Sequence, residues 1–229
     1  MKTPLDALIT TEENRDAITR IIEIVENHEH PQKIFLTGGE ATGKTLLLRA
    51  RAMEKNLLST KRVSYRPAWE LTKAVRENAW DGFFEEIGSY EVLFVDDFEG
   101  LLDDQEVGPL LFKLLMQERN SQKLDTVVAS RAPMAELELD AFEGALDGFE
   151  ELVLAPLDKD GLKALAIELF DVYHEEGTTP DISDDAFSYL ASWADGPASL
   201  RRALGLALEC SEFSSENTID RDAMKRLVG

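Results

Sequence analysis

A phosphate-binding pattern lies at residues 38–45. These residues fit the pattern G-x-x-x-x-G-K-[ST]. An apolar segment, KIFLTG, leads into the first glycine of the pattern, and a helical segment, GKTLLLRARAMEKNLL, begins at its last glycine. In this context backbone amides and a helix N-terminus converge on phosphate oxygens. Lys44 would reach the terminal phosphates, and the Thr45 hydroxyl would coordinate Mg²⁺. The sequence therefore predicts a nucleotide phosphate site built from Gly38, Gly39, Glu40, Ala41, Thr42, Gly43, Lys44, Thr45 and the following Leu46.

Two adjacent carboxylates end a second apolar segment. The run VLFV is followed by Asp96 and Asp97. Because the segment has the composition of a buried strand, we expect it to deliver both carboxylates to the sheet edge beside the phosphate loop. Asp96 is predicted to hold Mg²⁺ together with Thr45, and Asp97 to polarise the attacking water. The catalytic residues predicted from sequence are thus Asp97, Asp96 and Lys44. The alternative for Asp97 is a turn or helix-cap residue.

Further phosphate contacts are predicted outside these two motifs. Ser130 ends the apolar segment TVVAS and could sense the terminal phosphate, although a turn-capping serine is the alternative. Arg131, one residue on, is equally compatible with a surface ion pair. In the last third of the chain, the segment GPASLRRAL begins a helix with two arginines. Arg201 is the preferred phosphate contact and Arg202 the second choice; solvated arginines are the alternative for both.

The elements that must position these residues alternate along the chain. Five apolar segments are separated by helical ones, which predicts an α/β fold with a parallel five-stranded sheet flanked by helices. From Asp158 on the strand signal disappears and helical segments follow one another. We therefore expect an α/β nucleotide-binding unit at 1–157 and a small all-helical lid at 158–229. The five segments are KIFLTG, KRVSYRP, YEVLFVDD, LDTVVASRAP and ELVLAPL.

Composition limits the classes of partner. The chain has 24 Lys+Arg and 45 Asp+Glu, a net charge of −21, and no block rich in Lys or Arg. Since phosphate neutralisation dominates affinity for nucleic acids, we expect no direct binding to duplex DNA. The acidity serves either solubility or a basic protein partner. No apolar run approaches the roughly 18 residues that span a bilayer, no signal peptide is evident, and Cys210 has no partner cysteine, so we expect a cytoplasmic protein.

Taken together, these motifs resemble the AAA+ ATPase domains of the DnaA/Hda type, the family of bacterial replication initiators. The resemblance covers nearly the whole chain. It implies ATP or ADP with Mg²⁺ between the core and the lid, an adenine pocket lined by the entry segment from about Leu5, including Leu8 and Asn14, and stacking of subunits or partners through the nucleotide site. The segments that carry it are PLDALITTEENRDAI, LTGGEATGKTLLLRA, RVSYRPAWELTKAV, SYEVLFVDDFEGLL and VVASRAPMAEL.

Three departures from the family pattern refine this expectation. No helix-turn-helix segment follows the lid before Gly229, and the N-terminal MKTPLDAL lacks a clamp-binding motif. No Arg or Lys lies between Arg131 and Lys159, where the family places an arginine finger. We therefore expect a regulator of replication initiation that contacts another AAA+ protein, such as a replication initiator, with slow or partner-dependent ATP hydrolysis. The alternative is an adaptor whose bound nucleotide is structural, without useful turnover; the oligomeric state is open.

Overall fold

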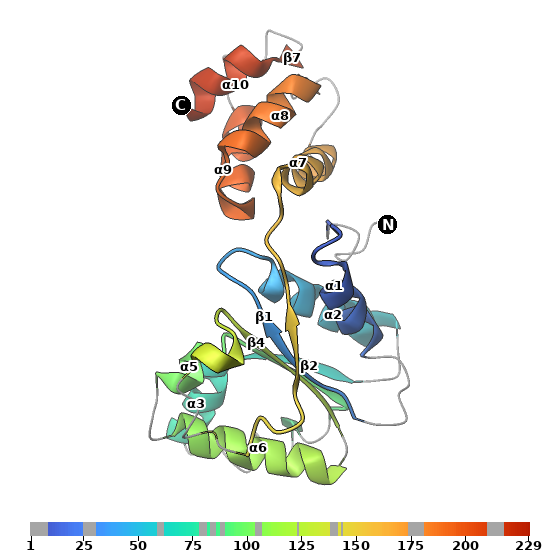
Figure 1. Ribbon diagram of the computed structural model, residues 1–229, viewed down its shortest axis with the longest axis vertical. Helices are drawn as coiled ribbons and strands as arrows, with labels where there is room; N and C mark the ends of the chain where they lie inside the picture. The colour runs from blue at the N-terminus through green and yellow to red at the C-terminus, as the bar shows by residue number, and fades with distance from the viewer. Residues whose placement is uncertain are drawn as a thin grey trace. The chain divides into compact units, whose positions relative to one another are not determined.

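The chain forms two compact units in the computed structural model (Figure 1). One contains the described residues of 12–155; the other contains residues 9–11 and the described residues of 156–229. The segment 9–11 thus belongs with the helical part, although the sequence assigns it to the α/β part. The structure describes residues 9–24, 31–58, 62–77, 82, 86–87, 90–103, 107–122, 124–137, 142, 144–173, 181–209 and 218–229.

The first unit contains the predicted five-stranded parallel sheet. Its strand order is β2-β3-β4-β1-β5, and every neighbouring pair is parallel. β3 is buried along its whole length, as expected for a near-continuous apolar run covered on both faces. The strands are β1 (Lys33–Thr37), β2 (Val63–Pro67), β3 (Val92–Asp96), β4 (Asp125–Ser130) and β5 (Glu150–Val153).

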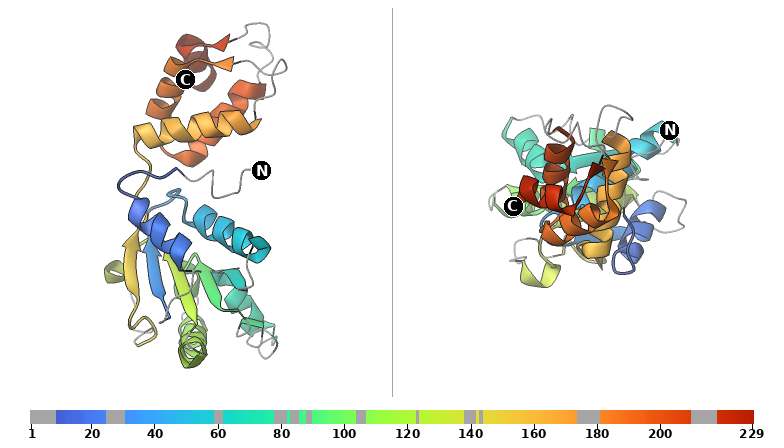
Figure 2. Two further views of the ribbon diagram at one scale, coloured as in Figure 1. Left: turned by 90° about the vertical axis from the view of Figure 1, so that its right-hand side faces the viewer. Right: turned by 90° about the horizontal axis from the view of Figure 1, so that it is seen from above.

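Helices cover both faces of this sheet (Figures 1 and 2). On one face, α2 (Lys44–Leu58) packs on β2 and β3, and α1 (Arg15–Glu23) packs on α2. The opposite face carries α3 (Ala68–Arg76), α5 (Glu99–Leu102) and α6 (Gly108–Gln122). At the centre of that layer the Phe98 ring meets the rings of Phe35 and Phe112 edge-on, with centroids 5.6 and 5.2 Å away. This packing fixes the short segment that follows the paired aspartates.

The first helix begins later than the sequence predicts. The apolar pattern of residues 11–29 predicts a helix capped by Thr10 or Thr11, but α1 begins at Arg15, after a turn at residues 12–14, with Asn14 at the N-cap. Its apolar face still follows the predicted helical period, since Ala17, Ile18 and Ile21 are buried. The change therefore affects the entry to the helix and not its packing.

A buried arginine ties α6 to the start of two strands. Arg119 is 1% exposed, and its Nε donates a hydrogen bond to Thr126 Oγ1 at 2.8 Å. Its other nitrogens donate to the carbonyls of Tyr90 and Glu91, both at 3.2 Å, and to that of Asp125. Burial lowers the pKa of Arg119 to about 10, against the opposing effect of Asp125, so the guanidinium stays charged at neutral pH. The strands β3 and β4, whose other ends carry the predicted site residues, are thus anchored at their beginnings.

The second unit is helical, as predicted, with one addition. Two strands of two residues each, β6 (Asp181–Ile182) and β7 (Thr218–Ile219), pair in parallel beside the helices. Residues from every helix bury a common apolar core that includes Ala166, Leu190, Leu200, Ala207 and Met224. The helices are α7 (Lys159–Tyr173), α8 (Asp184–Trp193), α9 (Pro197–Glu209) and α10 (Arg221–Val228).

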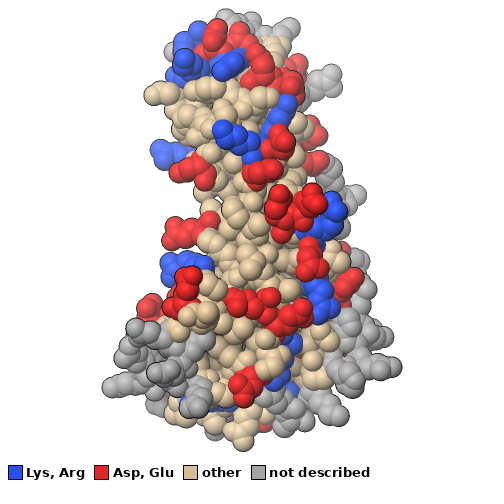
Figure 3. Space-filling view, viewed as in Figure 1, with Lys and Arg blue, Asp and Glu red and all other residues tan. Residues whose placement is uncertain are grey.

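Charges and helix lengths bear on the partner predictions. On the face in Figure 3, basic and acidic side chains of the described residues are interspersed, and no extended basic patch forms there.

Among the helices that the structure describes, none combines the length and the apolar character that a bilayer span requires.

Candidate functional site

The phosphate loop connects β1 to α2 by a tight turn at residues 38–43. Gly43 has φ of +99°, a left-handed conformation that favours glycine. A Cβ added to Gly38 would lie 2.5 Å from the carbonyl oxygen of Leu154, so this position has no room for a side chain. The Thr42 hydroxyl donates to the Gly39 carbonyl at 3.1 Å. This backbone delivers the chain to the N-terminus of a 15-residue helix, the end at which anions are stabilised.

Lys44 is buried against the loop that precedes it. Only 8% of the residue is exposed, and its Nζ donates to the carbonyl oxygens of Gly38 and Gly39, the latter at 2.9 Å. Burial lowers the pKa of Lys44, and the nearby carboxylates of Glu99 and Asp96 oppose this shift. The ammonium is therefore held by neutral carbonyl oxygens. A negatively charged phosphate oxygen could take their place and accept a stronger hydrogen bond.

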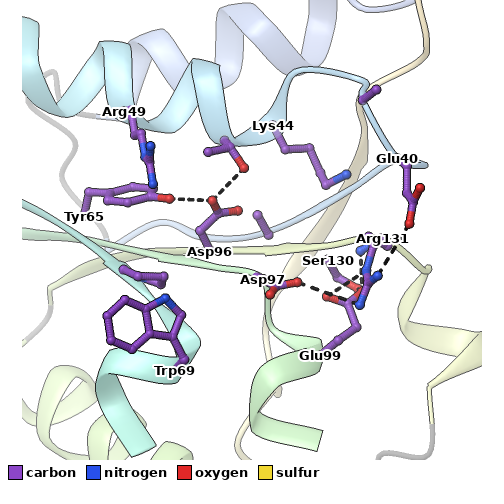
Figure 4. Close-up of a pocket in the computed structure, with 14 residues that line it drawn as sticks. Glu40, Lys44, Arg49, Tyr65, Trp69, Asp96, Asp97, Glu99, Ser130 and Arg131 are labelled. Carbon is purple, nitrogen blue, oxygen red and sulfur yellow. Dashed lines mark hydrogen bonds and ion pairs between the residues drawn. The ribbon is translucent and has the colours of Figure 1, made fainter. Parts of the chain in front are cut away.

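The structure brings the two predicted metal ligands together. Asp96, the last residue of β3, is 5% exposed, and its Oδ2 accepts a hydrogen bond from the Thr45 hydroxyl at 2.7 Å (Figure 4). The same oxygen accepts a second bond, from the Tyr65 hydroxyl at 2.6 Å. Burial and the bond to Asp96 raise the pKa of Tyr65 to about 12, so its hydroxyl remains a donor at neutral pH.

Tyr65 and Arg49 are site residues that sequence reasoning missed. β2 lies next to β3 with Tyr65 opposite Phe94 and Pro67 opposite Asp96, so Tyr65 and Asp96 point to the same face of the sheet. The Arg49 guanidinium lies over the Tyr65 ring, 4.9 Å from its centroid. The strand that ends at Pro67 was predicted, but its place beside the carboxylate strand was not, and that neighbour relation is what puts Tyr65 in the site.

Asp97 lies at the rim of the site, beside Arg131. It has a left-handed backbone, with φ of +57°, and its side chain is 58% exposed. The Arg131 guanidinium is 3.9 Å from Asp97 Oδ1, 3.6 Å from Glu40 Oε1 and 3.9 Å from Glu99 Oε2. Burial of its carboxyl group raises the pKa of Asp97, and the charge of Arg131 opposes the rise. Arg131 thus links the phosphate loop to two of the carboxylates.

Ser130 is in the site, but its hydroxyl is already bonded within the protein. It is fully buried at the end of β4, with Oγ 2.8 Å from Glu99 Oε1 and 2.7 Å from the Ala132 carbonyl oxygen. The Arg131 backbone N–H also donates to Glu99. Burial alone would raise the pKa of Glu99, but hydrogen bonds from two backbone amides and from Ser130 outweigh it, and the pKa is lowered. Glu99 was not predicted, although it is the third acidic residue after the apolar run.

The remaining predicted contacts lie elsewhere in the first unit, in the second unit or outside the described residues. Leu46 is 40% exposed on α2, and Asn14 is 3% exposed beside α1. Leu8 lies outside the described residues. Arg201 and Arg202 are exposed on α9, in the second unit. Their nucleotide contacts stay predictions.

The assembled residues surround a cavity of about 360 Å³. The phosphate loop and the start of α2 form one wall, and the ends of β2, β3 and β4 form the other (Figure 4). One wall offers a lysine and a helix N-terminus to an anion; the other offers the Thr45 hydroxyl and the Asp96 carboxylate, hard oxygen ligands that suit Mg²⁺. These residues fit a nucleotide phosphate chain with a divalent cation.

Comparison with known proteins shows to which family this chain is similar. The model of the bacterial DnaA ATPase domain matches residues 2–146, well over half of the chain. The chromosomal replication initiator protein DnaA of Bartonella quintana is 28% identical over 235 residues, which cover 95% of this chain and 47% of that protein. The chain thus spans about half the length of this relative.

Solved structures share the fold of the whole described chain. Domain III of the Thermotoga maritima replication initiation protein DnaA matches with a TM-score of 0.82 and 20% identity, covering 99% of this chain and 95% of that one. DnaA from Aquifex aeolicus, bound to AMPPCP, matches with a TM-score of 0.76 and 20% identity, covering 92% of this chain and 65% of that one. The chain belongs to the family of bacterial DnaA ATPase domains and is an AAA+ nucleotide-binding domain of that type.

Proposed function

We propose that this chain binds ATP or ADP with Mg²⁺ in the cavity described above. The observation that carries the proposal is the 2.7 Å bond between Thr45 and Asp96, which joins the helix after the phosphate loop to the end of β3. Mg²⁺ is commonly held by one or two protein oxygens together with nucleotide phosphates, and these two side chains supply such oxygens. A structure of the Aquifex aeolicus relative with AMPPCP bound supports the same assignment.

Most of the residues predicted from the sequence have a role in this proposal. Thr45 and Asp96 hold the cation, which when bound neutralises charge on the phosphates, and Tyr65 holds the Asp96 carboxylate in place. The loop amides and Lys44 bind the phosphates. Ser130 remains the proposed sensor of the terminal phosphate, a role that requires exchange of its bond to Glu99. From the rest of the chain, Arg201 is proposed for the phosphates, and Leu8 and Asn14 for the adenine.

The process that this nucleotide serves is proposed to be chromosomal replication initiation in the cytoplasm. The family supports this, and so does the name of the Bartonella quintana relative. We propose action through another AAA+ protein, such as a replication initiator, as in regulators of the Hda type. Hydrolysis should be slow or partner-dependent, because residues 132–158 contain no Arg or Lys that could complete a neighbouring site.

Direct binding to duplex DNA is not part of the proposed activity of this region. The net charge is −21, and the charges visible in Figure 3 are mixed. Counterion release needs clustered basic groups, so fluorescence anisotropy with a labelled duplex should show no salt-sensitive binding at moderate ionic strength.

A second function is favoured by one specific observation. The Asp97 side chain is 58% exposed and lies beside Arg131, a poor position from which to polarise a water. An adaptor that uses its nucleotide for stability alone would tolerate this arrangement.

One experiment on the purified chain distinguishes the regulator from the adaptor. Nucleotide released by acid is identified by chromatography, and ATP turnover is measured alone and with the full-length DnaA of the same organism. The proposed regulator carries ADP or ATP, turns over slowly alone and accelerates at least about tenfold with the partner. Bound nucleotide without acceleration supports the adaptor, and the absence of bound or bindable nucleotide contradicts both.

A further inference from the structure

Arg131 lies between the two loops that form the phosphate site. In the sheet, β4 is placed between β1 and β3, so the residue after β4 is flanked by the phosphate loop that follows β1 and by the carboxylates that end β3. Its guanidinium is 3.6 Å from Glu40 Oε1 on the loop and 3.9 Å from Asp97 Oδ1 after β3 (Figure 4). The strand order therefore gives Arg131 access to both walls of the cavity.

The carboxylates around Arg131 hold it by ion pairs that a phosphate can replace. Its distances to Glu40, Asp97 and Glu99 are 3.6, 3.9 and 3.9 Å, each longer than a hydrogen bond. The Glu40 side chain is 84% exposed, and ion pairs between exposed groups are weak. A phosphate group offers a guanidinium two parallel, charge-assisted hydrogen bonds. A phosphate that enters the cavity therefore competes well for Arg131.

Arg131 shares this cavity with Lys44, the lysine of the phosphate loop. Burial is the main cause that lowers the pKa of Lys44, and the charge of Arg131 acts in the same direction, so the two cations are close enough to repel each other. An anion that binds between two such cations relieves their repulsion. The pair therefore favours a ligand with more negative charge at this point of the cavity.

Few other cations are placed to bind a terminal phosphate. Among the described residues, four carboxylates and three basic side chains line the cavity. One of the three, Arg49, lies over the Tyr65 ring, 4.9 Å from its centroid. Lys44 and Arg131 thus remain for the phosphates. ATP has one phosphate more than ADP, and in this acidic surrounding the additional phosphate needs a positively charged partner.

We propose that Arg131 binds the terminal phosphate of ATP and makes the site discriminate ATP from ADP. This rests on the proposed function, to which it adds a residue that reads the length of the phosphate chain. When ATP binds, the guanidinium exchanges its contacts with Glu40 and Asp97 for the γ-phosphate, which also releases the Asp97 carboxylate. ADP lacks this phosphate and leaves Arg131 with the carboxylates. The ATP-bound and ADP-bound states then differ in the position of this side chain.

The test compares Arg131→Gln and Arg131→Lys with the control Arg20→Gln in the intact chain. Glutamine removes the charge, whereas lysine keeps the charge but lacks the planar pair of donors. Arg20 pairs with Glu150 at 2.8 Å and is not among the residues that line the cavity, so its replacement removes the same charge outside the site. Isothermal titration calorimetry in Mg²⁺ measures affinity for ADP and for the non-hydrolysable ATP analogue AMPPCP.

The expected effect is a loss that depends on the third phosphate. Arg131→Gln should bind ADP within about threefold of wild type and AMPPCP at least about tenfold more weakly, since a charge-assisted hydrogen bond is lost. Arg131→Lys should weaken AMPPCP binding by about threefold to tenfold. Arg20→Gln should change neither affinity by more than about twofold. Arg131 is half exposed, so both of its variants should fold; if the glutamine variant does not, the lysine variant decides.

Three results would overturn the proposal. An AMPPCP-to-ADP affinity ratio in the Arg131 variants equal to that of wild type would leave Arg131 without a contact to the third phosphate. Equal weakening of both ligands would make it a support of the loop. A loss in Arg20→Gln as large as that in Arg131→Gln would reduce the effect to net charge. A wild-type chain that binds neither ligand would instead overturn the proposed function itself, which keeps the two failures apart.

Discussion

The Thr45 hydroxyl lies 2.7 Å from Oδ2 of Asp96, although the two residues are 51 positions apart in the sequence. Thr45 is in the first turn of α2, and Asp96 ends β3. The contact joins a helix that follows one strand to the end of another, so it depends on the parallel sheet that sets both positions. It also defines the side of the cavity at which a cation would be held.

Replacement of Thr45 by valine should weaken nucleotide binding only when Mg²⁺ is present. Valine keeps the shape of threonine but has no oxygen for the cation. We expect ADP affinity to fall about tenfold in Mg²⁺ and to change little in EDTA. Isothermal titration calorimetry in both conditions measures this. Thr72→Val is the control, since Thr72 is also buried and its hydroxyl bonds to the Trp69 carbonyl outside the metal pair. Equal losses with and without Mg²⁺ would contradict the assignment.

Replacement of Tyr65 by phenylalanine should hold the Asp96 side chain less firmly without abolishing nucleotide binding. It removes the 2.6 Å bond to Asp96, and we expect a loss of about 1 kcal/mol in the free energy of unfolding and a modest loss of Mg²⁺-dependent affinity. Because the pKa of Tyr65 is about 12, the effect should be the same at neutral and at mildly alkaline pH. Urea denaturation and calorimetry measure the two quantities.

Tyr90→Phe is the matched control for this change. An arginine, Arg62, also lies over the Tyr90 ring, at 4.8 Å, but Tyr90 is not among the residues that line the cavity. A similar loss of Mg²⁺-dependent affinity in both variants would show that Tyr65 has no special relation to Asp96.

The sequence predicts the layers of this fold better than their details. Apolar runs such as VLFV are recognisable because a strand buried on both faces has little room for polar residues. The order of the strands leaves no such mark, since it depends on contacts between segments far apart in the chain. The pairs of residues in β6 and β7 are too short for a two-residue period to be detected.

The same distinction holds within the candidate site. Gly43, Lys44 and Thr45 are recognisable because the phosphate loop is local in sequence. Tyr65 depends on the pairing of β2 with β3, and Glu99 on the packing of Phe98, so neither follows from a motif. Side-chain contacts were also beyond the sequence, since no motif indicates the hydrogen bond from the Ser130 hydroxyl to Glu99; the contact of Ser130 with a phosphate stays a prediction.

Replacement of Asp97 by asparagine should stabilise the folded chain at neutral pH. Burial raises the pKa of Asp97, so the folded state disfavours the ionised form. The contribution of Asp97 to stability is therefore present below its ordinary pKa and is lost as pH rises through the folded value. Asparagine removes the charge and tolerates φ of +57°. The gain should stay under about 1 kcal/mol, because the side chain is more than half exposed and solvent screens it.

The pH dependence distinguishes this charge effect from an unrelated change in packing. Urea denaturation should show the gain of Asp97→Asn at neutral pH and a smaller gain as the pH approaches the ordinary pKa of an aspartate. A variant that is less stable than wild type at neutral pH, or a gain that does not depend on pH, would contradict the explanation.

The most direct measurement is calorimetric titration of the folded wild-type chain and of Lys44→Ala with ADP in Mg²⁺. Lys44 is the one charged donor contributed by the loop of residues 38–45, and loss of such a bond weakens binding by about tenfold to 100-fold. We predict saturable binding at one site per wild-type chain and a loss of that size in the variant. No heat from folded wild-type protein, or equal affinity in both proteins, would contradict a phosphate site at Gly38–Thr45.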